Sequence, residues 1–356
     1  MKIAFCWSNI SGYMVACLRE LASRHGVDVL GVFPEIRSTT NTAFDKETYA
    51  GVNIHWTSPH DSTAHLAGTI GNFHPDVIVI SGWNNAKYRA IARSTQFSQA
   101  TKILAIDNQY SASWRQSLGR LACWRLFQSF AGIMVPGERS WQLARFLGFA
   151  ESQIIRGTYG IDYDSFKRAH DSRRQSSWPR QFAFVGRLVE AKGIDILVSA
   201  YQEYRRRVSS PWTLTVCGKG PQQSLLKNQP GIEHRGFVQP RDLPDVLADH
   251  GAFVLPSRNE PWGQVIVEAA AAGLPIICTE ACGAGVELVH NGFNGQKIPT
   301  GKDRALIEAM RWMHDHADQV PLFGNRSSEL AAAYSAERWA DRLLTWLNPQ
   351  TEACAA

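Results

Sequence analysis

The chain has 356 residues, which is long enough for two domains with separate hydrophobic cores. Hydrophobic residues make up 44% and charged residues 19%, a composition typical of globular proteins that excludes the disordered and fibrous classes. No apolar run reaches the roughly 18 residues of a membrane-spanning helix. The net charge of +5 suits a protein that handles phosphates or lies near anionic lipid, and it does not indicate nucleic-acid binding.

The first residues and the cysteines together predict a cytoplasmic protein with reduced thiols. Lys2 and the short apolar run that follows lack the longer apolar core and cleavage site of a signal peptide, and they favour a buried strand. The 7 cysteines are an odd number. Cys278 and Cys282 have no second pair or nearby histidine, so no metal site is expected.

Short apolar runs alternate with helical periodicity along the whole chain. Parallel strands need a crossover connection, so this alternation predicts parallel sheets covered by helices. Strands are expected at Ile3–Trp7, Val27–Phe33, Val77–Ile80, Lys102–Ile106, Gly132–Val135, Phe182–Val185, Leu214–Cys217, Ile232–Arg235, Ala252–Leu255 and Ile276–Cys278. Helices are expected at Met14–Ser23, Leu118–Ser129, Ile194–Arg207, Gln264–Ala272 and Ala336–Leu347.

The polar, serine-rich segment Lys167–Arg180 interrupts this alternation and predicts a boundary between two α/β halves. We expect Rossmann-like domains over residues 1–167 and 168–335, and a last helical segment, 336–356, that packs back toward the N-terminal domain. Open α/β sheets bind ligands at the carboxyl ends of their strands, so the expected site is a cleft between the two domains.

Three glycine turns in the second half suit a nucleotide ligand. Gly186 and Arg187 follow a strand, and Lys192 comes five residues after the arginine, so both cations can reach one diphosphate. Gly218 ends another strand, and the loop at Phe237–Val238 could bind the edge of a base through main-chain groups. By itself the first motif fits an ordinary strand-to-helix loop equally well, and the other two by themselves fit such a loop better.

The most informative segment runs from Val254 to Pro275. A buried strand is followed by a polar loop with Glu260, and Gly263 opens a helix whose free amides suit phosphate or sugar oxygens. Glu268 lies just over one turn into that helix, where its carboxylate can accept two hydrogen bonds from vicinal hydroxyls such as those of a ribose.

The sequence around Glu260 and Glu268, Glu-Pro-Trp-Gly-x4-Glu, resembles the signature of the retaining GT-B glycosyltransferases. The glycine elements at 186–193, 236–238 and 292–295 follow in the order of that family. Tyr159-Gly-Ile-Asp in the first half resembles the Asn-Gly-Val-Asp element that precedes the donor domain. The resemblance is specific in the second half and thin in the first.

The resemblance implies that the N-terminal domain binds the acceptor and the C-terminal domain the nucleotide-sugar donor. Arg187 and Lys192 would neutralise the diphosphate, Glu268 would bind the ribose, and Glu260 would contact the transferred sugar without acting as a nucleophile. The implied donor-binding set is Gly12, Gly186, Arg187, Lys192, Gly218, Phe237, Val238, Glu260, Trp262, Gly263, Gln264, Val265 and Glu268.

The implied reaction transfers a hexose with retention from a nucleoside-diphosphate sugar to a saccharide or a lipid-linked acceptor, in the synthesis of cell-surface polysaccharide, lipopolysaccharide or glycolipid. A UDP-sugar is the first expectation and GDP-mannose the second. Neither metal nor cofactor is expected, because cations and helix amides can stabilise the leaving diphosphate.

The first half departs from the family pattern at two places. Where the family often has a histidine after a middle strand, this chain has Asp107, which could replace it as a polar contact or base. The first glycine loop is reduced to Ser11-Gly12, which suits either close approach to the donor or a simple turn.

Aromatic and basic residues alternate between residues 110 and 149. Such a helical surface can lie on anionic lipid, which suits a peripheral protein at the inner face of the cytoplasmic membrane. The same residues could instead fill the core of the first domain while the arginines are solvated. The residues concerned are Trp114, Arg115, Arg120, Trp124, Arg125, Phe127, Trp141, Arg145 and Phe146.

Three other functions share part of this pattern. An NAD-dependent oxidoreductase is excluded because no Gly-x-Gly-x-x-Gly follows the first strand. A sugar-nucleotide epimerase of the same build would share the donor contacts, but the pair of glutamates favours the transferase. A catalytically degenerate partner that only binds sugar nucleotides stays open because the first-domain histidine is missing.

Overall fold

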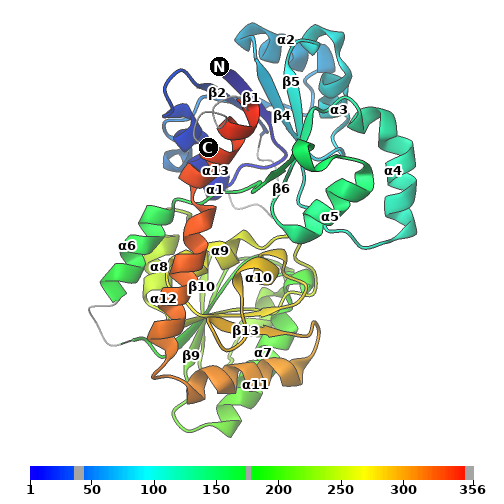
Figure 1. Cartoon of the computed structure of the whole chain (residues 1–356). Helices are drawn as coiled ribbons and strands as arrows, with labels where there is room; N and C mark the ends of the chain where they lie inside the picture. Colours follow the sequence, from blue (N-terminus) through cyan, green and yellow to red (C-terminus); the bar gives the residue numbers. More distant parts are fainter. Residues whose placement is uncertain (36–43, 174–177, 349–356) are drawn as a thin grey trace, which may run out of the picture. The chain divides into compact units, whose positions relative to one another are not determined.

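The computed structural model of the chain describes residues 1–35, 44–173 and 178–348. The chain divides into two compact units, which Figure 1 shows. The first contains Met1–Ile161 and the described residues from Ala336 on, and the second contains Asp162–Ser335. No helix of the described residues is long and apolar enough to cross a membrane.

The first unit is built on a seven-stranded parallel sheet with the order β3-β2-β1-β4-β5-β6-β7. Its strands are β1 (Lys2–Cys6), β2 (Asp28–Pro34), β3 (Ile54–Thr57), β4 (Val77–Ser81), β5 (Thr101–Ala105), β6 (Gly132–Val135) and β7 (Ile154–Arg156). Its helices are α1 (Gly12–Ala22), α2 (Thr63–Phe73), α3 (Ala86–Arg93), α4 (Trp114–Phe127), α5 (Glu138–Leu147) and α13 (Ala336–Leu347).

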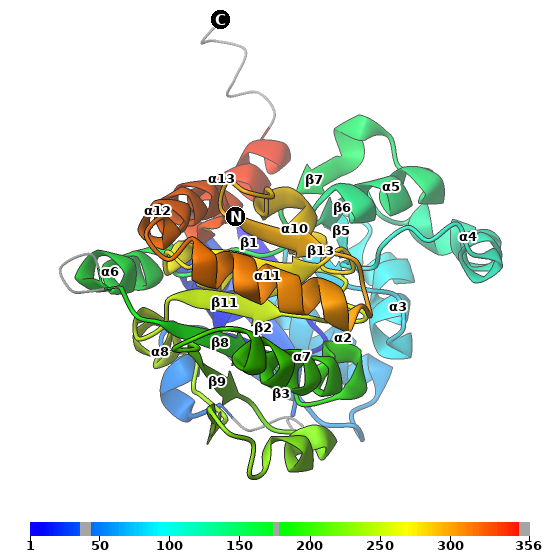
Figure 2. The same cartoon turned by 90° about the horizontal axis from the view of Figure 1, so that it is seen from below.

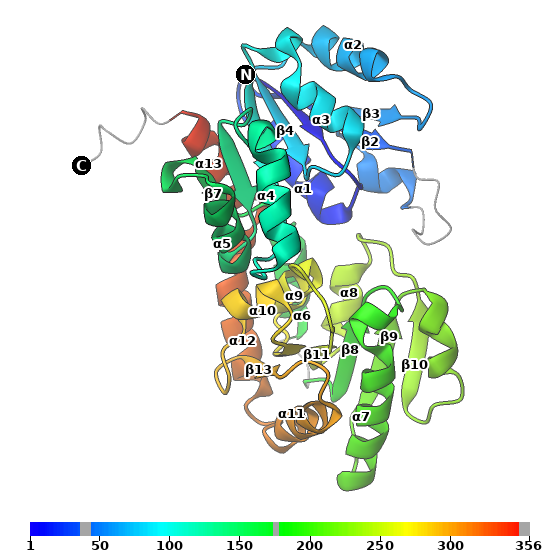
Figure 3. The same ribbon diagram turned by 90° about the vertical axis from the view of Figure 1, so that its right-hand side faces the viewer.

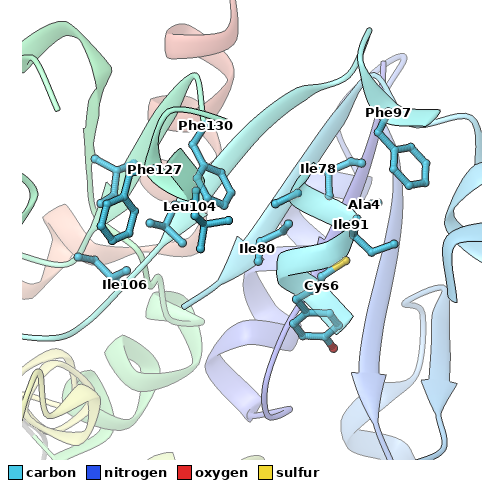
Figure 4. Packing of buried hydrophobic residues seen from close by; sticks show 14 of the residues in the cluster. Ala4, Cys6, Ile78, Ile80, Ile91, Phe97, Leu104, Ile106, Phe127 and Phe130 are labelled. Atoms are coloured by element: carbon cyan, nitrogen blue, oxygen red, sulfur yellow. The ribbon is translucent and has the colours of Figure 1, made fainter. Parts of the chain in front are cut away.

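Hydrophobic side chains cover both faces of this sheet, because successive strand residues point to opposite sides. Ile78 and Ile80 belong to the cluster that Figure 4 shows, together with residues such as Leu104 and Phe127. Val77 and Val79 belong to the cluster on the other face, which includes residues of α1 and α13. A sheet buried on both faces explains why its central strands are continuous apolar runs.

The C-terminal helix α13 packs within the first unit. Trp339 is buried, its ring lies 5.9 Å from that of Phe5, and its indole nitrogen donates a hydrogen bond to the carbonyl of Thr158 at 3.0 Å. Trp346 likewise donates to the carbonyl of Ser152 at 2.9 Å. The tryptophans of the last helix therefore attach it to strand β1 and to the segments on either side of β7.

The second unit has a six-stranded parallel sheet with the order β10-β9-β8-β11-β12-β13. Figure 2 shows α7 and α11 side by side over one face of it. The strands are β8 (Gln181–Val185), β9 (Thr213–Cys217), β10 (Ile232–Gly236), β11 (Ala252–Leu255), β12 (Ile276–Thr279) and β13 (Gly295–Ile298). The helices are α6 (Tyr163–Arg173), α7 (Ile194–Arg207), α8 (Leu243–Ala248), α9 (Gln264–Ala271), α10 (Gly283–Leu288), α11 (Asp303–Asp315) and α12 (Val320–Ala331).

The predicted α/β class with two parallel sheets is confirmed, and each predicted strand is present to within a residue or two of its expected bounds. Three strands were not predicted: β3, β7 and β13. All three lie at the edge of a sheet. An edge strand is short and partly exposed, so it lacks the continuous apolar run that reveals a central strand.

The polar segment Lys167–Arg180 is not a simple linker. Residues 163–173 form helix α6 of the second unit, and the change of unit comes earlier, between Ile161 and Asp162. Arg173 is buried, and its guanidinium donates hydrogen bonds to the carbonyls of Leu247 and Ala272 at 2.6 and 2.7 Å. Arg173, which lies within the segment predicted as the boundary, therefore holds the end of α6 to its own unit.

The cysteines of the described residues carry free thiols. All six described cysteines are free, and five of them are buried. Burial raises the pKa of Cys6 and of Cys17 to about 12, so both thiols stay protonated near neutral pH. Cys354 lies outside the described residues.

Candidate functional site

Three glycines meet where neighbouring strands of the second sheet end. The amide of Gly186, after β8, donates to the carbonyl of Cys217 at 3.0 Å, and the amide of Gly218, after β9, donates to that of Gly236 at 2.6 Å. A Cβ on Gly218 would lie 1.8 Å from the carbonyl oxygen of Gly186, and the φ of Gly218 is +145°. Only glycine fits there, because the two turns pack backbone against backbone at the carboxyl edge of the sheet, where parallel sheets bind ligands.

Arg187 follows Gly186 and is exposed. Among residues 1–35, 44–173 and 178–348, its guanidinium has no hydrogen-bond or ion-pair partner. A planar guanidinium without a protein partner is suited to bind two oxygens of a phosphate group. The structure therefore leaves one predicted diphosphate ligand available at this edge.

Lys192 is placed differently, because its ammonium group forms an ion pair with the carboxylate of Glu260. Their side chains are only 14% and 11% exposed. A close backbone approach brings them together: a Cβ on Gly193, whose φ is +70°, would lie 2.3 Å from the carbonyl oxygen of Pro256. Sequence analysis expected both side chains in the site but did not predict that they neutralise each other.

Two backbone hydrogen bonds from the start of α10 hold the loop between β11 and α9. The amide of Gly283 donates to the carbonyl of Glu260 at 3.2 Å, and that of Ala284 donates to the carbonyl of Trp262 at 2.7 Å. The indole of Trp262 is buried and donates to the side-chain oxygen of Gln264 at 2.8 Å. The side chains of Trp262 and Gln264 thus support the loop.

The start of α9 has the backbone geometry expected of the predicted anion site. Gly263 has a φ of +90° and precedes the first helical residue. Among the described residues, the amides of Gly263 and Val265 donate no hydrogen bond to the protein. Two free N–H groups at the positive end of a helix dipole attract a phosphate or a sugar hydroxyl.

Glu268 lies on α9 and is partly exposed. In the part of the chain that the structure describes, its carboxylate has no hydrogen-bond or ion-pair partner. Desolvation raises its pKa to about 7, since the surrounding protein disfavours the charge and no cation compensates it. A half-buried carboxylate without a partner is available to accept hydrogen bonds from the hydroxyls of a ligand.

The loop after β10 holds Phe237 and Val238, which are both half-buried. Gly236 precedes them with a φ of +69°, a left-handed conformation that turns the chain out of the strand. The imidazole of His234, in β10, lies 2.8 Å from the carbonyl oxygen of Gly218, so a contact joins the strand before this loop to the neighbouring glycine turn. Phe237, Gly218 and Gly186 thus follow three adjacent strands.

In the first unit, Asp107 follows β5 and accepts a hydrogen bond from the hydroxyl of Tyr159 at 3.1 Å. Burial and the nearby carboxylate raise the pKa of Tyr159 well above its ordinary value, so the tyrosine is a neutral donor. Sequence analysis did not single out Tyr159, although it occupies the asparagine position of the Asn-Gly-Val-Asp element. Gly12 is the first residue of α1, which Ser11 caps through the amide of Met14 at 3.3 Å.

Comparisons with known proteins identify the family and the fold. Residues 179–316 match the family model described as "Glycosyl transferases group 1". The chain is 29% identical over 264 residues to a glycogen synthase of Mycobacterium tuberculosis, which covers 70% of this chain and 62% of that protein. It is 33% identical over 242 residues to the putative teichuronic acid biosynthesis glycosyltransferase TuaC of Bacillus subtilis. That match covers 67% of this chain and 53% of TuaC.

Among solved structures, the chain resembles HepE of Anabaena in complex with UDP-glucose, with a TM-score of 0.74 and 17% identity over 97% of this chain and 99% of that one. This likeness shows the fold, which is GT-B. The stretches matched in the two curated relatives span about half to two thirds of those proteins. On these matches and this fold, the chain belongs to the group 1 glycosyltransferases of the GT-B class.

Proposed function

We propose that this protein transfers a hexose with retention from a nucleoside-diphosphate sugar to a saccharide or lipid-linked acceptor, without a metal ion. The observation that carries the proposal is the set of groups left without protein partners at the carboxyl edge of the second sheet. These are the guanidinium of Arg187, the amides at the start of α9 and the carboxylate of Glu268, counted among the described residues. A cation, a helix amino terminus and a carboxylate match a diphosphate and a ribose.

Charge develops on the diphosphate as the bond to the sugar breaks. Arg187 and the free amides of Gly263 and Val265 would stabilise that charge as fixed donors. Lys192 adds a positive charge that Glu260 already balances in the absence of ligand. We propose that Glu260 accepts hydrogen bonds from the transferred sugar, while the ammonium of Lys192 holds its carboxylate and faces the diphosphate.

For the donor, a UDP-sugar is our first proposal and GDP-mannose the second. HepE, whose structure contains UDP-glucose, supports the first. A D-rhamnosyltransferase of Pseudomonas aeruginosa is 30% identical over half of this chain, so other bases and sugars belong in the test. Relatives named for teichuronic and colanic acid biosynthesis support a role in cell-surface polysaccharide synthesis.

For the acceptor side, we propose that the first unit binds the acceptor with Asp107 as a polar contact or base, oriented by Tyr159. A lipid-linked acceptor would bring the protein to the inner face of the cytoplasmic membrane, with contact through residues 110–149. The alternative of a degenerate sugar-nucleotide-binding partner predicts donor binding without turnover.

The decisive experiment is thermal stabilisation by UDP, GDP, ADP and TDP without added metal. A nucleotide at a hundred times its dissociation constant stabilises the folded state by about 2.7 kcal/mol. We expect one nucleotide to raise Tm, Glu268→Ala to abolish the effect, and the exposed Glu329→Ala on α12 to leave it unchanged. If none of the nucleotides shifts Tm, the proposed donor site is wrong.

Retention is tested separately, by NMR of the anomeric configuration of the transferred sugar in the product.

A further inference from the structure

Helix α4 carries an unusual concentration of exposed hydrophobic side chains. Eight large hydrophobic residues are exposed in the described part of the chain, and five of them lie between Tyr110 and Trp124. The exposed fractions reach 68% for Trp114 and 70% for Leu121. Scattered single residues of this kind are normal on a surface, but a cluster on one element marks an interaction site.

The helix is attached to the first unit by only one side. Figure 1 shows α4 at the outer edge of that unit, and in Figure 3 it lies in front, beside α3 and α5. Its buried residues are Leu126 and Phe127, both in the last turn, and Phe127 packs edge-on against Trp83 at 5.5 Å. Sequence analysis left open whether these aromatics fill the core: Phe127 does, and Trp114 and Trp124 do not.

The exposed residues form a stripe along the helix. Successive residues of an α-helix advance by about 100°, so Trp114, Leu118 and Leu121 point within about 60° of one another. By the same geometry Arg115 and Arg120 lie on opposite flanks of this stripe, and the guanidinium of Arg120 lies over the ring of Phe146 at 5.2 Å. Arg125 falls on the line of the stripe itself, one turn beyond Leu121. The outer side of the helix is therefore apolar along most of its length and carries cations at its flanks and at its end.

Charge distinguishes among possible partners for this face. No aspartate or glutamate occurs between Asp107 and Glu138, whereas three arginines lie on α4 itself. The guanidinium groups of Arg115 and Arg125 lie over the rings of Trp114 and Trp124, at 5.6 and 5.5 Å from the ring centroids. A second copy of this chain would bring arginines against arginines, whereas anionic lipid headgroups would neutralise them.

We propose that α4 lies flat on an anionic bilayer surface. Trp114, Leu118 and Leu121 would insert between the headgroups as far as the start of the acyl chains, and the arginines would contact lipid phosphates. Tryptophan suits the interface because its ring is apolar and its N–H is polar, and arginine can extend its charge to the headgroups while its stem stays apolar. This deepens the proposed function, since it places the acceptor-binding unit at the surface that displays a lipid-linked acceptor, and the placement rests on that function.

The test is sedimentation of the full chain with vesicles of phosphatidylcholine alone or with 30% phosphatidylglycerol, a composition chosen on the order of natural anionic content. We expect binding to the anionic vesicles that weakens as salt rises, because exposed charges are screened. Trp114→Ala with Leu121→Ala should weaken binding by about tenfold or more. The matched control is Leu322→Ala, which removes a leucine that is 47% exposed on α12. This substitution should leave vesicle binding unchanged.

The arginines are tested separately. Arg115→Gln with Arg120→Gln should weaken binding to anionic vesicles by about fivefold per residue and leave binding to neutral vesicles unchanged. Arg304→Gln, an exposed arginine at the start of α11, is the control. Brominated lipids should quench the fluorescence of tryptophans that reach the bilayer. In the double variant Trp114→Phe with Trp124→Phe, the brominated lipids should no longer quench the fluorescence.

Each variant is first checked for an unchanged Tm and unchanged stabilisation by nucleotide, so that a failure to fold is not read as a failure to bind. Absence of vesicle binding, or binding that the α4 variants leave unchanged, overturns the proposal whatever the nucleotide assay shows. A dimer in light scattering that Trp114→Ala with Leu121→Ala dissociates, without vesicle binding, would assign the face to a second copy instead. Loss of nucleotide stabilisation with intact vesicle binding would overturn the donor site alone.

Discussion

The hydroxyl of Tyr159 donates a hydrogen bond to a carboxylate oxygen of Asp107 at 3.1 Å, across 52 positions of sequence. Asp107 stands where the first half of the chain departs from the family pattern, and Tyr159 opens the Tyr-Gly-Ile-Asp element that resembles the Asn-Gly-Val-Asp element of the family. The departure at Asp107 is therefore in contact with the first residue of that element. Tyr159 is itself packed edge-on against Tyr13 at 5.2 Å and Trp7 at 6.3 Å, so its hydroxyl is held in place.

If Asp107 acts in the reaction, Tyr159→Phe should lower kcat more than it changes KM for the donor. The substitution keeps the ring and removes a hydrogen bond to a charged group, which is worth about 1.5–3 kcal/mol and corresponds to roughly 10- to 150-fold in rate. The measurement is steady-state transfer with the wild type and the variant. Tyr163→Phe is the control, because it removes a tyrosine hydrogen bond to the carbonyl of Ser328 in the second unit.

A fall in kcat shared by both tyrosine variants would mean a general loss of stability rather than a role for Asp107. Asp107→Asn then separates a base from a polar contact. A base is lost with either Asn or Ala, whereas a polar contact survives in part with Asn.

The Lys192–Glu260 ion pair predicts strong coupling between the two side chains. Lys192→Met leaves a largely buried carboxylate without its cation, so we expect the free energy of unfolding to fall by about 1.5–3 kcal/mol. Glu260→Gln in the same chain should recover part of that loss, because no uncompensated charge remains. Urea unfolding of the two single variants and the double variant checks this. Additive single effects would show that the pair contributes nothing beyond its separate residues.

Glu268 predicts a pH dependence of donor binding. Its pKa in the folded protein is about 7, and only the ionised carboxylate accepts two hydrogen bonds from a ribose. Lowering the pH from 8 to 6 should therefore weaken binding of the nucleoside diphosphate by about tenfold, while Glu268→Gln should bind weakly at both values. Calorimetric titration at the two pH values, with Glu329→Gln as the control, measures it. A wild-type affinity that does not change with pH would contradict the role of this carboxylate.

The same carboxyl affects stability in a defined direction. Its pKa is raised by folding, so the folded state holds a proton that the unfolded state has lost between the ordinary pKa, 4.5, and about 7. Stability from this group is thus lost as pH rises through that window, and above it the desolvated charge destabilises the fold. Glu268→Gln should raise Tm at pH 8 and lose this advantage below pH 4.5, which thermal unfolding at several pH values tests.

The sequence was sufficient to predict the class of fold because the central strands are buried on both faces and read as apolar runs, as in Val77–Ser81. It was insufficient for edge strands such as Gly295–Ile298, whose middle residues are polar and half-buried. In the site, the local sequence was enough to predict Glu260 on a loop and Glu268 on the helix that follows it. The Lys192–Glu260 and Tyr159–Asp107 contacts were not, because they join residues 68 and 52 positions apart.

A substitution at Gly218 tests whether the close contact between two glycine turns holds the donor site. A Cβ there would lie 1.8 Å from the carbonyl oxygen of Gly186 and 3.0 Å from its carbon, in a backbone conformation that other residues rarely adopt. Gly218→Ala must displace the turn that carries Arg187, so we expect loss of nucleotide stabilisation together with a destabilisation well above the roughly 1 kcal/mol of a strained φ alone. Gly26→Ala is the matched control, since its φ is +72° and no atom lies within 4 Å of its Cβ position. It should cost about 1 kcal/mol in urea unfolding and leave nucleotide binding intact. Equal effects of the two substitutions would mean that the contact between the two turns has no part in holding the donor site.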